Sequence, residues 1–286
     1  MKKKWIIALS AIVAVIVIFV ILSFTLFSLR TIELDYRTNK TYITATDEEI
    51  IESGEIKMGG SVFFCNKNKY IEKIESKNPY IKVINIETVF PSKFVIHVAE
   101  RQEIFAIEHN DQFYITDDEF KVLKITDSYI SDQTNAILLE GLQVADENYA
   151  VGQFMNVSGY QPIYDALFEN NRPLSEQITL IESINLTEIY DDVLQTNQSA
   201  IELKFFNGQT YIIYNSTYGL TYKVELMLDV FSQIYTYIGQ TIKVSGEDVV
   251  LTEDNLKTAT IVIKNYYDYR EHGQEDCYFD IIPATI

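Results

Sequence analysis

The chain of 286 residues is 47% hydrophobic and 22% charged, a balance that favours folded domains and excludes an intrinsically disordered protein. Its 41 Asp and Glu outnumber its 23 Lys and Arg, and the net charge of −18 disfavours nucleic acid and anionic lipid as partners. Only two cysteines are present, Cys65 and Cys277, so we expect free thiols rather than a disulfide framework or a cysteine-based metal site.

A membrane anchor is predicted near the start of the chain. Trp5 to Leu29 contains no charged residue, and a helix over this run, at about 1.5 Å per residue, exceeds the ~30 Å hydrocarbon core of a bilayer. Lys2 to Lys4 precede it, so the positive-inside rule predicts a cytoplasmic tail over residues 1–4 and a single-pass type II protein with all later residues outside. The alternative is a cleaved signal peptide, which would have a shorter apolar core and a small-residue cleavage site.

A small domain is predicted over residues 30–101. Residues 31–36 alternate between apolar and polar side chains, which indicates a strand. Thr46 and Glu49 fit a capping box that begins a helix, and Asn66 caps a second helix that ends before Pro79. Two alternating strands then flank a turn at Pro91, so the predicted order is β-α-α-β-β. The predicted core consists of Ile50, Phe63, Ile71, Ile74, Val83 and Ile96.

A second domain is predicted over residues 102–286. Asn207-Gly208 between two alternating runs is a strong hairpin signal. Apolar residues recur with a helical period from Leu220 to Ile238. A last long strand is expected at residues 258–264, and residues 277–281 are expected to pair back on it. The predicted fold class is therefore α+β, with a curved antiparallel sheet and a helix packed on it.

No constellation of catalytic residues is evident in the sequence. His97 lies on a predicted strand, while His109 and His272 sit beside turn residues. The nucleophile-elbow and zinc-protease motifs are absent, and Asp117-Asp118-Glu119 lacks the spacing of a calcium-binding loop. We therefore predict no catalytic residue, no metal and no cofactor, although a pair of carboxylates for glycoside hydrolysis need not be adjacent in sequence.

The order of these elements and several short motifs resemble the FtsQ/DivIB family of bacterial cell division proteins. The matching motifs are Asp47-Glu48-Glu49-Ile50, Gly60-Ser61-Val62-Phe63-Phe64, Asn78-Pro79-Tyr80-Ile81-Lys82, Phe90-Pro91-Ser92, Val98-Ala99-Glu100-Arg101, Phe113-Tyr114-Ile115-Thr116-Asp117, Lys121-Val122-Leu123 and Leu138-Leu139-Glu140-Gly141-Leu142. The sequence departs from the family at Ser61, commonly Asn, and at residues 118–120, commonly containing Gly. The resemblance identifies residues 30–101 as an FtsQ-type POTRA domain and residues 102–286 as an FtsQ/DivIB-type β domain.

The resemblance implies a non-enzymatic scaffold of the divisome, enriched at the division septum, which recruits or stabilises other division proteins by strand addition and POTRA contacts. It implies partners of the FtsB/DivIC and FtsL kind and no nucleic acid. In the family a partner strand adds to a sheet edge near the C-terminus. The matching positions here are Thr260, Ile261, Val262, Ile263 and Lys264, with Tyr266 and Tyr267.

Physical reasons also favour partner binding at residues 260–264. An exposed edge strand offers unpaired N–H and C=O groups unless it carries Pro, a bulge or an inward charge, and this run has no Pro and no charge before Lys264. The neighbouring tyrosines would add contact area, as they do in interface hot spots. The alternative is an interior strand whose tyrosines cover the core.

Two other functions stay open at the level of the sequence. An anchored cell-envelope enzyme, such as a carbohydrate hydrolase, would need a large pocket with converging polar groups, whereas a scaffold would show an open sheet edge. A POTRA module of an outer-membrane translocation machine would precede a membrane β-barrel, and no region of that length follows.

Overall fold

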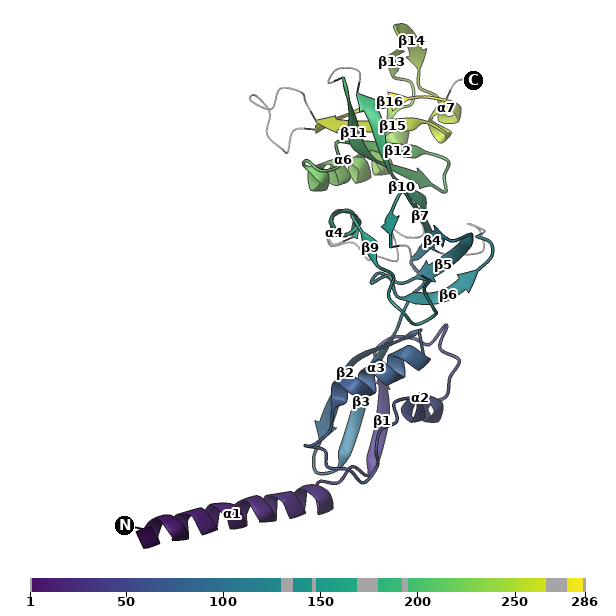
Figure 1. Ribbon diagram of the computed structural model, residues 1–286. Helices are drawn as coiled ribbons and strands as arrows, with labels where there is room; N and C mark the ends of the chain where they lie inside the picture. The colour runs from purple at the N-terminus through teal and green to yellow at the C-terminus, as the bar shows by residue number, and fades with distance from the viewer. Residues whose placement is uncertain are drawn as a thin grey trace. The chain divides into compact units, whose positions relative to one another are not determined.

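The computed structural model describes residues 2–129, 136–145, 148–168, 180–191, 195–265 and 277–284. The chain divides into two compact units, which we describe separately (Figure 1). The first unit comprises Met1–Gln102 with Ala150–Gln153, and the second comprises Glu103–Tyr149 with Phe154–Ile286.

The first unit begins with the helix α1, Lys2–Thr25, which is drawn in purple in Figure 1. Its described apolar side chains are largely exposed, including Trp5 at 76% and Phe24 at 55%. Among the described residues, no helix combines the length and the hydropathy that crossing a membrane requires. The anchor over residues 5–29 stays a prediction.

The rest of the first unit confirms the predicted β-α-α-β-β order. Its elements are β1 (Thr31–Tyr36), α2 (Asp47–Ser53), α3 (Lys67–Lys77), β2 (Ile81–Val89) and β3 (Lys93–Glu100). The strand order is β1-β3-β2, with β3 parallel to β1 and antiparallel to β2. Both predicted caps are present, because the Thr46 and Glu49 side chains bond to each other's backbone N–H and the Asn66 side chain accepts from Lys69.

The core of this unit is the predicted one apart from Phe63. The Ile50, Ile74, Val83 and Ile96 side chains are buried, and Ile71 packs against them from a partly buried position. The prediction of Phe63 as a core residue was wrong, because its side chain is 41% exposed. Its neighbour Val62 is 4% exposed and occupies the core position instead.

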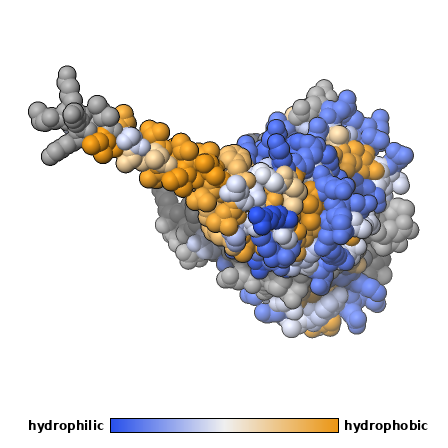
Figure 2. Space-filling model, turned by 90° about the horizontal axis from the view of Figure 1, so that it is seen from below, coloured by the Kyte–Doolittle hydropathy of each residue, from blue (hydrophilic) through white to orange (hydrophobic). Residues whose placement is uncertain are grey.

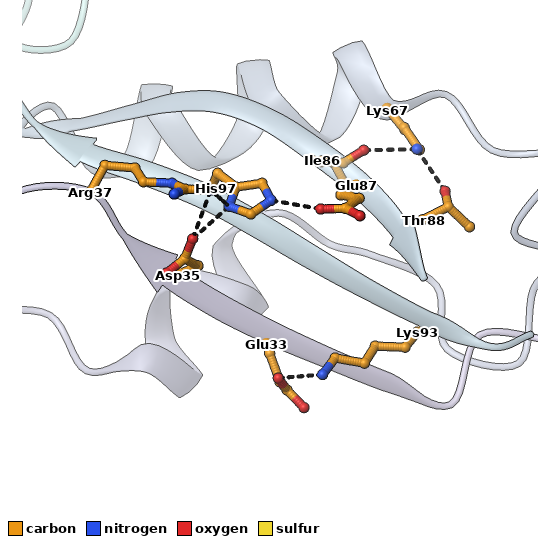
Figure 3. Close-up of polar contacts among 9 residues, drawn as sticks. All are labelled: Glu33, Asp35, Arg37, Lys67, Ile86, Glu87, Thr88, Lys93 and His97. Atoms are coloured by element: carbon orange, nitrogen blue, oxygen red, sulfur yellow. Dashed lines mark hydrogen bonds and ion pairs between the residues drawn. The ribbon is translucent and has the colours of Figure 1, made fainter. Parts of the chain in front are cut away.

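The sheet face opposite the helices carries a polar network centred on His97 (Figure 3). Phe94, Ile96 and Val98 alternate with His97 along β3, so the imidazole points away from the core. Its Nδ1 lies 2.7 Å from Oδ2 of Asp35 on β1, and its Nε2 lies 3.1 Å from Oε2 of Glu87 on β2. The histidine therefore joins all three strands, and its position on β3 confirms that it lies on a strand, as predicted.

The second unit is built on one sheet with the order β16-β15-β12-β11-β10-β7-β4-β5-β6. Its strands are β4 (Phe105–His109), β5 (Gln112–Thr116), β6 (Val122–Thr126), β7 (Ile137–Glu140), β10 (Ile181–Asp191), β11 (Thr196–Phe205), β12 (Thr210–Tyr214), β15 (Thr260–Asn265) and β16 (Cys277–Ile282). The predicted hairpin is the pair β11 and β12, which is joined through Asn207-Gly208. Gly208 has a φ of 94°, a conformation that glycine adopts without strain.

The predicted antiparallel sheet is instead a mixed one. The pairs β4–β7, β7–β10 and β12–β15 are parallel. Between β12 and β15 the chain passes through α6 (Leu220–Gln233), which contacts both strands. A helical crossover returns the chain to the same direction, and this explains the parallel pair.

Smaller elements complete the second unit. They are β8 (Gln143–Val144), β9 (Val157–Ser158), α4 (Gln161–Phe168), η1 (Ile234–Tyr237), β13 (Thr241–Val244), β14 (Glu247–Val250) and α7 (Glu253–Lys257). The helical period predicted from Leu220 to Ile238 thus corresponds to α6 followed by the 3₁₀ turn η1.

Candidate partner-binding edge of the C-terminal sheet

The strand β15 lies inside the sheet, paired with β12 on one side and β16 on the other. Ile261, Val262 and Ile263 are between 0% and 5% exposed, so both faces of the strand are covered. A continuous apolar run is typical of a strand buried on both faces. The expectation that residues 260–264 form the exposed edge was therefore wrong, and the alternative of an interior strand describes them.

The predicted partner-binding residues are only partly within the described chain. Thr260 to Lys264 make up most of β15, and Lys264 Nζ lies 5.0 Å from the centre of the Tyr214 ring. Tyr266 and Tyr267 lie outside the described residues. A role of these seven residues in binding stays a prediction, and a partner strand could pair with β15 at this edge only in place of β16.

The last strand of the sheet is β16, which pairs with β15 from Thr260↔Ile282 to Asn265↔Cys277. Within the described part of the chain, no other strand pairs with its outer side. Phe279 and Ile281 turn inward and pack against the core, while Ile282 is 46% exposed. A strand of this kind offers unpaired backbone groups to a further strand. The sequence predicted that residues 277–281 pair back on the preceding strand, but not that they form the edge of the sheet.

A smaller groove, of about 470 Å³, lies on the first unit. The groove beside β16 has a volume of about 670 Å³. Its walls are β16 and the β13–β14 hairpin, which contributes Ile242 and Val244. The ring of Tyr237 also lines the groove, edge-on to Phe279 at 5.7 Å between centroids. The edge is thus bordered by a groove of mixed character, because Gln240, Lys243, Ser245 and Asp280 line it together with the apolar side chains.

Asn255 ties the hairpin, α7 and the end of β16 together. Its side chain accepts a hydrogen bond from the Thr252 N–H at 2.8 Å and donates to the carbonyl of Val250 at 3.0 Å. Its own carbonyl accepts from the N–H of Ala284, two residues after β16, at 3.1 Å. Because Asn255 is 4% exposed, these bonds are protected from water and fix one end of the edge strand.

The helix α6 supports the same strands from one face, and its buried Lys223 fixes its start. The ammonium donates to the carbonyls of Tyr214 and Asn215, both at 2.7 Å. Burial disfavours the charged form and lowers the pKa of Lys223 to about 8. Because both of its hydrogen-bond partners are backbone carbonyls, Lys223 is a structural residue that links α6 to the end of β12.

In the ranges that the structure describes, no group of three or more His, Cys, Asp or Glu side chains could hold a metal ion. The edge itself offers backbone hydrogen bonding, together with contacts to the apolar and polar side chains that line the groove.

Comparisons with known proteins place the first unit in a family. The FtsQ-type POTRA domain family matches residues 28–101. Cell division protein DivIB of Clostridium tetani is 29% identical over 165 residues, which cover 58% of this chain and 57% of that protein. Cell division protein DivIB of Clostridium acetobutylicum is 36% identical over 95 residues, which cover 33% and 37% of the two chains.

A third relative, Cell division protein DivIB of Clostridium botulinum (strain Hall), is 35% identical over 89 residues, or 31% of this chain and 32% of that protein. The matches therefore span little more than half, or about a third, of these relatives' own length. Residues 28–101 thus match the FtsQ-type POTRA domain family, and the chain is similar to the cell division protein DivIB of these clostridia.

Proposed function

We propose that this chain is a non-enzymatic scaffold of the bacterial divisome, which recruits or stabilises other division proteins at the septum. The place of β16 at the end of the sheet, where no other strand that the structure describes pairs with its outer side, carries the proposal, because a scaffold that works by strand addition needs a sheet edge that a further strand can reach. The names of its relatives, each a cell division protein, support the same process.

The partner on this proposal is an extended segment of a divisome membrane protein of the FtsB/DivIC or FtsL kind. Backbone hydrogen bonds to β16 would supply affinity that does not depend on sequence. Apolar side chains of the segment would enter the groove beside Phe279, Ile242 and Val244, where they would be removed from water. Thr260 to Lys264 would then contribute as the strand directly behind β16.

The POTRA domain offers a second contact surface. The groove of about 470 Å³ on this domain is lined by residues 42–45 and 77–81. Tyr42 stacks on Tyr80 there with 5.5 Å between ring centroids. Tyrosine pairs of this kind give large contact area at low entropy cost, so this groove is our proposed site for the POTRA contacts.

The proposal includes a single-pass anchor over residues 5–29 with the two folded units outside the cell membrane. The apolar side chains of α1 are exposed on several sides, as Trp5, Ile16 and Phe24 illustrate at 76%, 55% and 55%. A helix that is apolar all round is stable only where protein or lipid covers it. The basic Lys2 to Lys4 at its start support the cytoplasmic position of the tail.

Localisation in dividing cells tests the function. The full chain, fused at its N-terminus to an oxygen-independent fluorescent tag, would replace the DivIB of a bacterium in which that protein is depleted. We expect a fluorescent band at mid-cell and restored division. A uniform envelope signal in cells that still fail to divide, at a normal protein level, would contradict the proposal.

A further inference from the structure

Three segments meet at the end of the POTRA domain where the chain leaves α1, and we call residues 26–31, 57–69 and 88–93 together the POTRA tip. Backbone hydrogen bonds join them: Val62 donates to Phe27 at 3.0 Å, and Leu29 donates to Gly60 at 2.8 Å. Arg30 donates to Ser92 at 2.8 Å. The tip is therefore a defined part of the folded unit.

The tip exposes a cluster of phenylalanines. Phe63 lies between Phe27 and Phe90, with ring centroids 5.2 Å and 5.5 Å away. Phe63, Phe64 and Phe90 are nevertheless 41%, 60% and 59% exposed, and Met58 of the same tip is 51% exposed. A contiguous exposed apolar patch of this kind marks a surface that binds a protein, a membrane or another apolar ligand.

The patch is continuous with the apolar surface of α1. Phe19 of α1 lies 5.6 Å from Phe63, and Phe24 lies 6.1 Å from Phe64, between ring centroids. Seen from this end, the hydrophobic colour of the helix continues onto the surface where the helix joins the domain (Figure 2). Phe19 precedes the end of α1 at Thr25 by six residues, or about 9 Å at the helical rise.

The tip is positively charged, although the chain as a whole is acidic. Its three segments contain no acidic residue and five basic ones: Arg30, Lys57, Lys67, Lys69 and Lys93. Lys67 and Lys93 are engaged within the domain, since Lys67 donates to Ile86 and Thr88 and Lys93 pairs with Glu33 (Figure 3). Lys57 and Lys69 are exposed. The acidic average of the whole chain therefore does not describe the tip.

We propose that the POTRA tip docks on the outer surface of the membrane that α1 spans, an inference that rests on the proposed anchor. Phe63, Phe64 and Phe90 enter the boundary between head groups and acyl chains, and Lys57 and Lys69 contact anionic phospholipid head groups. The roughly 9 Å between Phe19 and the helix end matches the ~5–10 Å by which interfacial elements bury their apolar face. Basic residues beside such a face add attraction to anionic lipids.

Docking gives the POTRA domain a fixed orientation. One flexible joint between α1 and β1 would let the domain rotate freely, whereas a second attachment through the tip holds its sheet at one angle to the membrane. The groove at residues 42–45 and 77–81 lies at the other end of the same domain, beyond the strand ends at Tyr36 and Ile81. It would therefore face away from the lipid, toward proteins.

Depth-dependent fluorescence quenching tests the docking in the full chain. Trp5 is the only tryptophan, so the Trp5→Phe variant is a silent background into which Phe64→Trp, Val13→Trp or Ile84→Trp is introduced. Val13 is in the middle of α1, and Ile84 is a matched POTRA control that is 52% exposed away from the tip. Each protein is reconstituted in vesicles of lipids brominated near the head-group end of the acyl chain.

We expect bromination to lower the fluorescence of the indole at position 64 roughly twofold or more, as for a group within about 10 Å of the interface, and to leave position 84 unchanged. Because the vesicles contain no second protein, quenching identifies lipid as the occupant. Quenching at position 13 without quenching at position 64 would overturn the docking and leave the patch to a protein partner. An unquenched position 13 would instead overturn the anchor.

The basic residues are tested in the same system. Vesicles with phosphatidylglycerol and brominated lipid should quench position 64 more than vesicles of brominated zwitterionic lipid alone. Lys57→Gln with Lys69→Gln should remove this difference, whereas Lys73→Gln with Lys77→Gln, whose lysines pair with Glu55 outside the tip, should keep it. Equal quenching in both lipids would overturn the contact with anionic head groups.

Discussion

The guanidinium of Arg101 lies 3.1 Å from the carboxylate of Glu75, where 3% of the arginine side chain and 15% of the glutamate side chain are exposed. The same carboxylate accepts the Val83 N–H at 2.7 Å, and Arg101 Nε lies 3.4 Å from the carbonyl of Ile81. This pair therefore joins α3 to β2 and to the end of β3. The final residue of the Val98-Ala99-Glu100-Arg101 motif is thus a structural residue of the POTRA domain.

Breaking this pair should destabilise the POTRA domain strongly. Arg101→Met leaves the Glu75 charge buried without its partner, and we expect a loss of about 3–5 kcal/mol in the free energy of unfolding. Hydrogen exchange of the β2 and β3 amides in the full chain would measure it. The double variant with Glu75→Met should recover much of the loss, because no unpaired charge remains. A single variant with native protection would contradict this assignment.

Substitutions of Phe63 and Phe94 test which phenylalanine belongs to the core of the POTRA domain. Phe94 is 1% exposed, so Phe94→Ala should cost about 3–5 kcal/mol through the cavity it leaves. Phe63→Ala should cost less than about 1.5 kcal/mol, because much of the ring is already exposed. Urea unfolding of both variants, followed through POTRA amide exchange, separates them. Equal losses of unfolding free energy in the two variants would show that Phe63 is a core residue.

Local signals predicted most of the POTRA domain. The Thr46–Glu49 capping box, the Asn66 cap and the turn at Pro91 each operate within a few residues, so the sequence contains all the partners involved. The choice between Val62 and Phe63 is different in kind. Both are apolar neighbours, and which one turns inward depends on Phe27 and Phe90, which the fold brings from other segments.

The candidate edge shows the same limit over a longer distance. The apolar run of β15 is compatible with an edge or an interior strand, and only its pairing with β16 decides between them. One signal was present in the sequence and overlooked: a helix between two strands favours a parallel crossover, as β12, α6 and β15 form. The groove depends on the β13–β14 hairpin and β16 meeting, which no local pattern encodes.

The buried Lys223 predicts a rise in stability with pH. Its folded pKa of about 8 lies below the ordinary value of about 10.4, so the unfolded chain binds more protons between these values. The contribution of Lys223 to the free energy of unfolding is therefore largest above the pKa of the unfolded chain. This contribution is lost as the pH falls through the folded pKa. From pH 8 to about 9.5, the unfolding free energy should rise relative to that of Lys223→Met, by at most about 1.4 kcal/mol per pH unit.

Urea unfolding of the second unit at a series of pH values measures this difference. Lys257→Met, which replaces an exposed lysine, is the control and should show no such rise. A difference between wild type and Lys223→Met that stays flat or falls with pH would contradict a buried lysine that is neutralised in the native state.

The edge of β16 predicts opposite outcomes for two adjacent proline substitutions. Successive N–H groups of a strand point to opposite sides, so one of Asp280 and Ile281 donates toward β15 and the other toward the outside. Proline at the inward position removes a ladder bond and should destabilise the second unit by about 3 kcal/mol or more. Proline at the outward position should leave the unit folded but remove a donor meant for the added strand.

Asp280→Ala and Ile281→Ala control for the loss of each side chain, and Val262→Pro in the interior strand β15 should unfold the unit. Each variant is assayed for amide protection of β15 and then, if folded, for binding to a purified membrane complex of the DivIC and FtsL kind. We expect the folded proline variant to bind at least about tenfold more weakly than its alanine control, equivalent to about 1.4 kcal/mol. An outward proline near the centre of this six-residue strand would interrupt the hydrogen bonds between β16 and an added strand. If the folded proline variant keeps its amide protection and binds with undiminished affinity, the partner strand therefore does not add to β16.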